Sequence, residues 1–151
     1  MTFSIRFTTV DEMLGETATR LQLQHREELT TNKALMKLAP DEAKYKVIEA
    51  AGKLLALVAE LDGVIIGYSI NFIDCHPHYK DLIISNNDLL YLDKAHRRSN
   101  YGKILRDETK KRAKDKGAKM QMWHAKPGSA FKIILERDGC KVQDVIYSEE
   151  L

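Results

Sequence analysis

Apolar residues recur along this chain in two rhythms, either at alternate positions or at every third or fourth position. Alternation is typical of a half-buried strand, and the wider spacing is typical of an amphipathic helix. In the first half of the chain they predict a strand at Ser4–Thr9, a helix at Val10–Leu29, a helix from Pro40 to Gly52, and strands at Leu54–Glu60 and Val64–Phe72. Asp62-Gly63 between the last two strands indicates a hairpin.

The second half of the chain continues with single strands and helices in turn. The pattern predicts a loop at 73–87, a strand at Asp88–Asp93, a charged helix from Gly102 to Lys116, a strand at Ala118–Ala125, a short helix at Gly128–Asp138 and a last strand at Lys141–Tyr147. The complete order is β-α-α-β-β-β-α-β-α-β. It predicts an α/β fold in which a mixed sheet carries helices on both faces.

Length and composition favour one domain over residues 1–151, because a second domain in a chain of this size would have too small a core. We expect a cytoplasmic protein with no membrane segment. No run of 18 apolar residues occurs, and the first residues lack the basic start and apolar stretch of a secretory signal. Cys75 and Cys140 lie far apart, so we expect reduced thiols and no structural zinc site.

Positive charge is concentrated in one segment of the chain. Residues 94–119 contain eleven Lys or Arg against Asp107, Glu108 and Asp115, a net charge of +8, whereas the whole chain has only +2. Such a segment is either a solvated basic helix or a surface that meets an anion.

The stretch Asp88–Leu105 (DLLYLDKAHRRSNYGKIL) places a predicted strand directly before a polar loop and a predicted helix start. Backbone N–H groups in the first turn of a helix have no intrahelical acceptor, and the helix dipole is positive there. A phosphate or pyrophosphate can therefore bind at such a place. Arg97, Arg98 and Lys103 would add positive charge.

At this stretch the sequence resembles the GCN5-related N-acetyltransferase (GNAT) family, whose signature R/Q-x-x-G-x-G/A follows a strand and opens a helix. The signature falls on Arg97-Arg98-Ser99-Asn100-Tyr101-Gly102. Asn100 replaces the first glycine, and we expect it to be tolerated because Asn enters positive φ at modest cost. The resemblance spans nearly the whole chain and implies a mixed, mostly antiparallel central sheet in a GNAT-like acyl-CoA N-acyltransferase fold.

The resemblance also implies functional roles. Acetyl-CoA would be the acyl donor, with its pantetheine arm along the backbone of Leu90, Tyr91 and Leu92 like an added strand. The pyrophosphate-binding segment would be Arg97, Arg98, Ser99, Asn100, Tyr101, Gly102 and Lys103. Asp88 falls where polyamine-acetylating relatives carry a carboxylate, and it is our candidate catalytic base. Many members place a Tyr acid where this chain has Leu135.

Such a base is useful because an amine with a pKa near 10.4 is mostly protonated at pH 7, and attack requires its neutral form. A solvated Asp is a weak base, so Asp88 would act with a raised pKa or through a water molecule. A backbone N–H of Leu90 or Leu92 would stabilise the thioester oxygen as charge develops on it. Both roles require an irregular, splayed strand.

Several alternatives remain open at this stage. The basic segment 94–119 could belong to a nucleic-acid-binding module, and the departures from the family pattern could mark a degenerate domain that binds CoA or a protein without turnover. His124 could relay a proton, and Tyr91, Tyr101 or Tyr147 could replace the missing acid. The sequence Cys75-His76-Pro77-His78 lacks an evident fourth ligand, so we expect no metal.

The acceptor is not identified by the sequence. It could be an amine of a small molecule or of a protein, and the segments that would shape its pocket, Thr30–Pro40 and Ile73–Asn87, mix both charges. The sequence also leaves open whether two copies associate as a homodimer.

Overall fold

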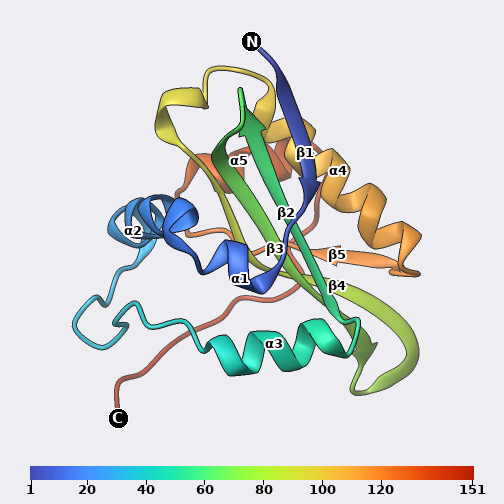
Figure 1. The fold of residues 1–151 in the computed structure, drawn as a ribbon. Coiled ribbons are helices and arrows are strands. Elements are labelled where there is room, and N and C mark those ends of the chain that lie inside the picture. The colour runs from blue at the N-terminus through green and yellow to red at the C-terminus, as the bar shows by residue number, and fades with distance from the viewer.

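A five-stranded sheet forms the centre of the computed structural model, which describes residues 1–151. The strands are β1 (Phe3–Phe7), β2 (Leu54–Leu61), β3 (Val64–His76), β4 (Tyr79–Leu92) and β5 (Met120–Met122). The helices are α1 (Val10–Met13), α2 (Glu16–Leu29), α3 (Glu42–Ala50), the short 3₁₀ helix η1 (Lys94–His96), α4 (Tyr101–Asp115) and α5 (Ala130–Arg137). The strands follow the order β1-β2-β3-β4-β5, and all neighbours are antiparallel except β4 and β5 (Figure 1). The predicted mixed, mostly antiparallel sheet is confirmed.

Helices pack on both faces of the sheet, as predicted (Figure 1). On one face Met13 of α1 and Leu21 of α2 are buried against Val58 and Tyr68. On the other face Leu105 of α4 is buried in a second apolar cluster with residues of β2 and β3. Because successive side chains of a strand point to opposite faces, the central strands supply both clusters and read as continuous apolar runs.

The hairpin between β2 and β3 has the predicted turn. Asp62 and Gly63 have φ angles of 51° and 79°. Two successive positive φ angles match the right-handed twist of a two-residue hairpin, and Asp and Gly are among the residues that adopt them most readily.

The helix predicted at Val10–Leu29 is divided into α1 and α2. Gly15 lies at the division, where an added Cβ would approach the backbone oxygen of Asp11 to 3.1 Å. This close approach explains why the chain turns at a glycine, a feature that apolar periodicity does not detect.

The loop predicted at 73–87 is wrong. Those residues form the arms of a long hairpin that turns only at Pro77 and His78, so the strand predicted at Asp88–Asp93 is the end of β4. Asn87 belongs to the strand because its side chain is buried and bonded to Ile70 O at 3.3 Å and to Asn71 Oδ1 at 2.9 Å.

Two further strand predictions differ from the structure. The strand predicted at Ala118–Ala125 is reduced to the three residues of β5, and residues 141–147 form no strand. All residues from 141 to 151 are exposed, and they take part in no hydrogen bond or ion pair. Val145 and Ile146 are 67% and 78% exposed.

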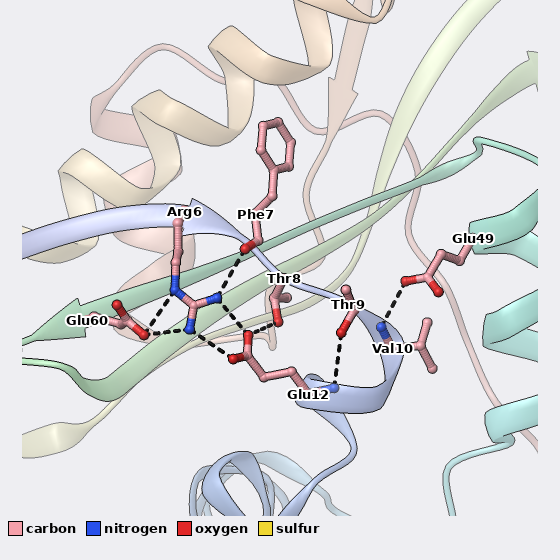
Figure 2. A network of polar contacts seen from close by, with 8 residues as sticks. All are labelled: Arg6, Phe7, Thr8, Thr9, Val10, Glu12, Glu49 and Glu60. Atoms are coloured by element: carbon pink, nitrogen blue, oxygen red, sulfur yellow. Dashed lines mark hydrogen bonds and ion pairs between the residues drawn. The ribbon is translucent and has the colours of Figure 1, made fainter.

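A polar network centred on Arg6 joins the first strand to the elements around it (Figure 2). The Arg6 guanidinium bonds Glu12 of α1 at 2.7 Å and Glu60 of β2 at 2.6 Å. Glu49 of α3 accepts the Val10 N–H at 2.8 Å, which ties α3 to the start of α1. Hydrogen bonds to these two carboxylates raise the pKa of Arg6, and the bond from Arg6 lowers the pKa of Glu12. These contacts connect α1 to β1, β2 and α3.

None of the helices combines the length and apolar character needed to cross a lipid bilayer.

Candidate active site

The second half of β4 has an open edge. β5 pairs with β4 only at Ile84–Asn86, while β4 continues along β3 as far as Leu92. Asp93 N donates to Ile66 O of β3 at 2.7 Å. Because the backbone groups of an antiparallel strand alternate in direction, the N–H groups of Leu90 and Leu92 point away from β3. They therefore face the space that β5 leaves free, where the Leu92 carbonyl accepts Arg97 Nε at 2.9 Å.

A β-bulge interrupts β4 at Asp88. Leu89 pairs with Ile70 and Asn87 pairs with Asn71, so Asp88 has no partner on β3. The buried Asn87 amide holds the bulge, because it donates to Leu89 O at 3.1 Å as well as to Ile70 O. Bulges bend a strand and redirect side chains, and they are frequent beside active sites. β4 thus has the irregularity that the roles of Asp88 and Leu90 require.

The Asp88 carboxylate is exposed and held on one side. The hydroxyl of Tyr45 on α3 donates a hydrogen bond to Oδ2 of Asp88, and Oδ1 has no protein partner. Burial, followed by this bond, raises the pKa of Tyr45. Tyr45 therefore stays protonated and leaves one oxygen of Asp88 free to accept a proton or a water hydrogen bond.

Four backbone N–H groups beyond the end of the open β4 edge have no acceptor in the protein. They belong to Arg98, Asn100, Gly102 and Lys103. The N-cap residue of α4, Asn100, makes no side-chain capping bond, whereas Ser129 caps α5 at Lys132 N. Tyr101 N is satisfied by Ser99 Oγ at 3.3 Å. The start of α4 thus presents unsatisfied donors at the positive end of a 15-residue helix.

Gly102 is not required by the packing of the protein. A Cβ at this position would meet only Leu92 Cδ2, at an ordinary contact distance of 3.6 Å. Asn100 has φ −84°, so the expectation that it adopts positive φ is wrong. A φ of −84° is open to any L-residue, so this position does not require a glycine.

The cations flanking the loop are less free than expected. Arg97 forms a two-fold ion pair with Glu28 of α2, at 2.5 and 2.8 Å, and Lys103 pairs with Asp107 at 2.5 Å. Only Arg98 of the three makes no ion pair. Within the basic helix, the buried Arg106 bonds Asp138 at 2.8 Å. Only Glu28 and Asp138 among these partners lie outside residues 94–119, so they offset two of the eight net positive charges of the segment.

Glu28 also connects the loop to a buried aromatic cluster. Tyr91 OH donates to Glu28 at 3.1 Å, the Arg97 guanidinium lies 5.0 Å from the Tyr91 ring centroid, and His25 stacks on that ring at 4.8 Å. Burial lowers the pKa of His25 to about 4 and raises that of Tyr91 to about 12. The bond from Arg97 lowers the pKa of Glu28. At neutral pH His25 is uncharged, and the cluster holds the end of β4 against α2.

The other candidate residues take separate positions. Tyr101 stacks on Phe3 with centroids 4.0 Å apart, and Leu135 is buried. Tyr147 lies in the exposed C-terminal segment. His124 Nε2 lies 2.8 Å from Asn86 Oδ1, where β4 and β5 separate. No three His, Cys, Asp or Glu side chains lie close enough to hold a metal ion.

Sequence reasoning missed Tyr45 and Glu28. Each reaches the site from a helix that lies more than forty residues away along the chain. No spacing or motif signals such a contact, since only the packing of α2 and α3 on the sheet creates it.

Comparison with known proteins identifies the fold. No protein-family model and no curated protein matches the chain. Several solved structures do match the chain. An aminoglycoside acetyltransferase from an uncultured soil metagenomic sample has 17% identity over 100% of this chain and 99% of that chain, with a TM-score of 0.76.

Two further structures agree with this match. Glucosamine-6-phosphate N-acetyltransferase from Arabidopsis thaliana has 18% identity over 99% of each chain and a TM-score of 0.73. An aminoglycoside N-acetyltransferase in complex with CoA has 17% identity over 98% of this chain and 99% of that chain, with a TM-score of 0.70. The resemblance noted in the sequence is therefore confirmed at the level of the fold, and this chain has the fold of the GCN5-related N-acetyltransferases.

Proposed function

We propose that this protein is an N-acetyltransferase that takes the acetyl group from acetyl-CoA and transfers it to an amine. The observation that carries the proposal is the junction of the open β4 edge with the four unsatisfied N–H groups at the start of α4. A pantetheine arm needs backbone hydrogen bonds along an extended edge, and a pyrophosphate needs N–H donors at its end. This chain offers both, with the edge at Leu90–Leu92 followed directly by the N–H donors of Arg98–Lys103.

The residues present fit acetyl-CoA as the acyl donor. The Leu90 carbonyl and the Leu92 N–H would bond the pantetheine amides, while the N–H groups of Arg98, Asn100, Gly102 and Lys103 would bond the pyrophosphate oxygens. The missing side chain at Gly102 lets a phosphate approach the backbone, because nothing else in the protein occupies that position. Arg98 is free to add a charge-assisted bond.

The chemistry assigned to the chain is transfer by direct attack in a ternary complex. The amine nitrogen forms a bond to the thioester carbonyl carbon, and the carbon–sulfur bond breaks to release the thiol. Oδ1 of Asp88 takes the amine proton directly or through a water molecule, and the Tyr45 hydroxyl keeps the carboxylate oriented. The Leu90 N–H stabilises the negative charge that develops on the thioester oxygen. No acidic side chain stands at position 135, so the departing thiolate takes its proton from solvent.

The acceptor is the least constrained part of this proposal. Two of the matched structures are aminoglycoside acetyltransferases and one is a glucosamine-6-phosphate N-acetyltransferase. We therefore propose an amine of a small molecule first and a protein amine second. It would enter beside Asp88 and Tyr45.

A thiol-release assay tests the proposal. Acetyl-CoA is incubated with the protein and a panel of amino sugars, aminoglycosides, polyamines and peptides, and free thiol is measured. We expect amine-dependent release that Asp88→Asn lowers. Binding of acetyl-CoA without release for any amine would contradict the enzymatic proposal and favour a CoA-binding domain without turnover.

A further inference from the structure

A network of buried polar side chains lies on the face of the sheet that α4 covers. Its neighbours on this face form the apolar cluster around Leu105. The members are at most 2% exposed, and they include Ser69, Asn71, Asn87 and Thr109. An amide or hydroxyl group in such surroundings costs free energy unless it is hydrogen-bonded. Apolar side chains of the same shape would give similar stability, so the place of this network beside the bulge of β4 indicates a further role.

The network connects α4 to β4 through β3. Thr109 Oγ1 of α4 lies 2.9 Å from Ser69 Oγ of β3, and Asn71 Nδ2 donates to the same serine oxygen at 3.0 Å. Asn71 Oδ1 then accepts the Asn87 amide at 2.9 Å and the Gln121 amide at 3.3 Å. Gln121 belongs to β5, and the pairing of β5 with β4 ends one residue later. The position of the Asn87 amide is therefore set by a network that includes α4, β3 and β5.

The Asn87 amide ends this network on the backbone of the open β4 edge, where it donates to Leu89 O at 3.1 Å. The Leu89 carbonyl and the Leu90 N–H belong to one peptide group, which is planar and trans, so the two bonds point in opposite directions. A group that holds the carbonyl in place therefore directs the Leu90 N–H into the space that β5 leaves free. The bond also polarises the peptide group, which makes this N–H a stronger donor.

The bond to Leu89 O lies where the ladder between β3 and β4 is interrupted. Asp88 has no partner on β3, and pairing resumes with Leu89 and Ile70. The Asn87 side chain spans this interruption, because it donates to Ile70 O at 3.3 Å as well as to Leu89 O. A strand bends and twists at a bulge, so the ladder alone defines the direction of the next peptide group less closely. A donor that stabilises developing charge has to be oriented before the reaction begins.

We propose that Asn87 is a positioning residue for acetyl transfer, which holds the Leu89–Leu90 peptide group so that the Leu90 N–H points at the thioester oxygen. The inference rests on the proposed function, in which this N–H stabilises the negative charge that develops on that oxygen. Asn87 itself is buried and acts only through the backbone.

Residual dipolar couplings of the backbone N–H groups in the ligand-free protein test the positioning itself, because they report the direction of each N–H bond relative to the fold. The Leu90 coupling should change in Asn87→Ala and in Asn87→Val, a second variant whose β-branched side chain suits a strand. Two buried controls should leave it unchanged. Thr109→Val removes a hydrogen bond at the far end of the network, and Ser85→Ala removes a hydroxyl of β4 that has no partner. The same Leu90 coupling in wild type and both Asn87 variants, or an equal change in Thr109→Val, would overturn the inference.

Infrared spectroscopy of bound acetyl-CoA, isotope-labelled at the carbonyl carbon of its acetyl group, tests the consequence. A hydrogen bond to the thioester oxygen lowers the carbonyl stretching frequency. Wild type and the two controls should show this shift. Asn87→Ala and Asn87→Val should lose most of it, while the Kd for acetyl-CoA in calorimetry should change little because the pyrophosphate donors are untouched.

The two ways in which this test can fail are distinct. Bound acetyl-CoA that shows no shift even in wild type would contradict the role of the Leu90 N–H in the proposed function, and the inference with it. A shift that both Asn87 variants keep in full would overturn the inference alone.

Discussion

The Arg6 network and the segment Arg98–Lys103 are two polar regions built on opposite principles. Arg6 meets two carboxylates and a carbonyl oxygen, and Thr8 and Thr9 bond Glu12, so the network is internally satisfied (Figure 2). The segment Arg98–Lys103 leaves four backbone donors without an acceptor. Satisfied polar groups stabilise a fold, whereas unsatisfied donors at a helix start are available to a ligand. Substitutions in the first region should change stability, and those in the second should change binding.

Gly102→Val should give the largest effect, on the second region alone. The valine side chain would occupy the space of the phosphate and break at least two charge-assisted hydrogen bonds, each worth about 1.5–3 kcal/mol. We expect the Kd for acetyl-CoA to rise by about 100-fold or more in calorimetry. Thermal unfolding should be little changed because an added Cβ meets only Leu92. Unchanged affinity in a folded Gly102→Val protein would place the pyrophosphate elsewhere.

The pH dependence of stability should reveal the buried aromatic cluster of His25 and Tyr91, whose polar groups have partners within the protein. Burial lowers the pKa of His25 to about 4, below the value of about 6.5 expected when unfolded. The unfolded state therefore binds a proton first, and the free energy of unfolding should fall by about 3 kcal/mol as the pH drops from 6.5 to 4.

Denaturant titrations at several pH values test this expectation. His25→Gln should abolish this decrease in the free energy of unfolding between pH 6.5 and 4. His78→Gln, at an exposed histidine, should retain it. An equal pH dependence of the free energy of unfolding in wild type and His25→Gln would show that His25 is not the titrating group.

Asp88→Asn should lower the rate by about 10²-fold near neutral pH, as loss of a general base typically does. The deficit should shrink at high pH, where the amine loses its proton without help. The control is Asp81→Asn, an exposed carboxylate on the same strand. Parallel pH–rate profiles for wild type and Asp88→Asn would remove Asp88 from the mechanism.

Arg6→Gln should give the smallest effect, and only on stability. An exposed ion-pair network is worth about 1 kcal/mol. Arg6 lowers the pKa of Glu12, so its contribution is present above the unfolded Glu pKa of about 4.3 and is lost as the pH falls through the lower folded value. Chemical denaturation at pH 7 and at pH 3 measures this. A change in acetyl-CoA affinity would contradict the separation of the two regions.

The order of elements as far as the last helix could be predicted from the sequence, apart from the division of the first helix, because periodicity and turn residues act locally. Asp62-Gly63 sets its hairpin within two residues, and the loop before Gly102 opens a helix as the pattern indicates. The loop prediction at 73–87 is wrong because an asparagine such as Asn87 can serve a turn or, when its amide is fully bonded, the interior of a sheet. Tyr45 and Glu28 could not be found, since their contacts depend on how two helices pack. Residues 141–147 have a strand pattern but form no strand, because periodicity does not determine whether a segment lies beside an edge of the sheet.

Calorimetric titration with acetyl-CoA, beside S-acetylpantetheine and in low and high salt, tests the central claim most directly. The account predicts one acetyl-CoA bound per chain, an affinity that falls with salt, and at least about tenfold weaker binding of S-acetylpantetheine, which lacks the pyrophosphate that the Arg98–Lys103 donors bind. No heat and no thermal shift with acetyl-CoA up to millimolar concentration would contradict it.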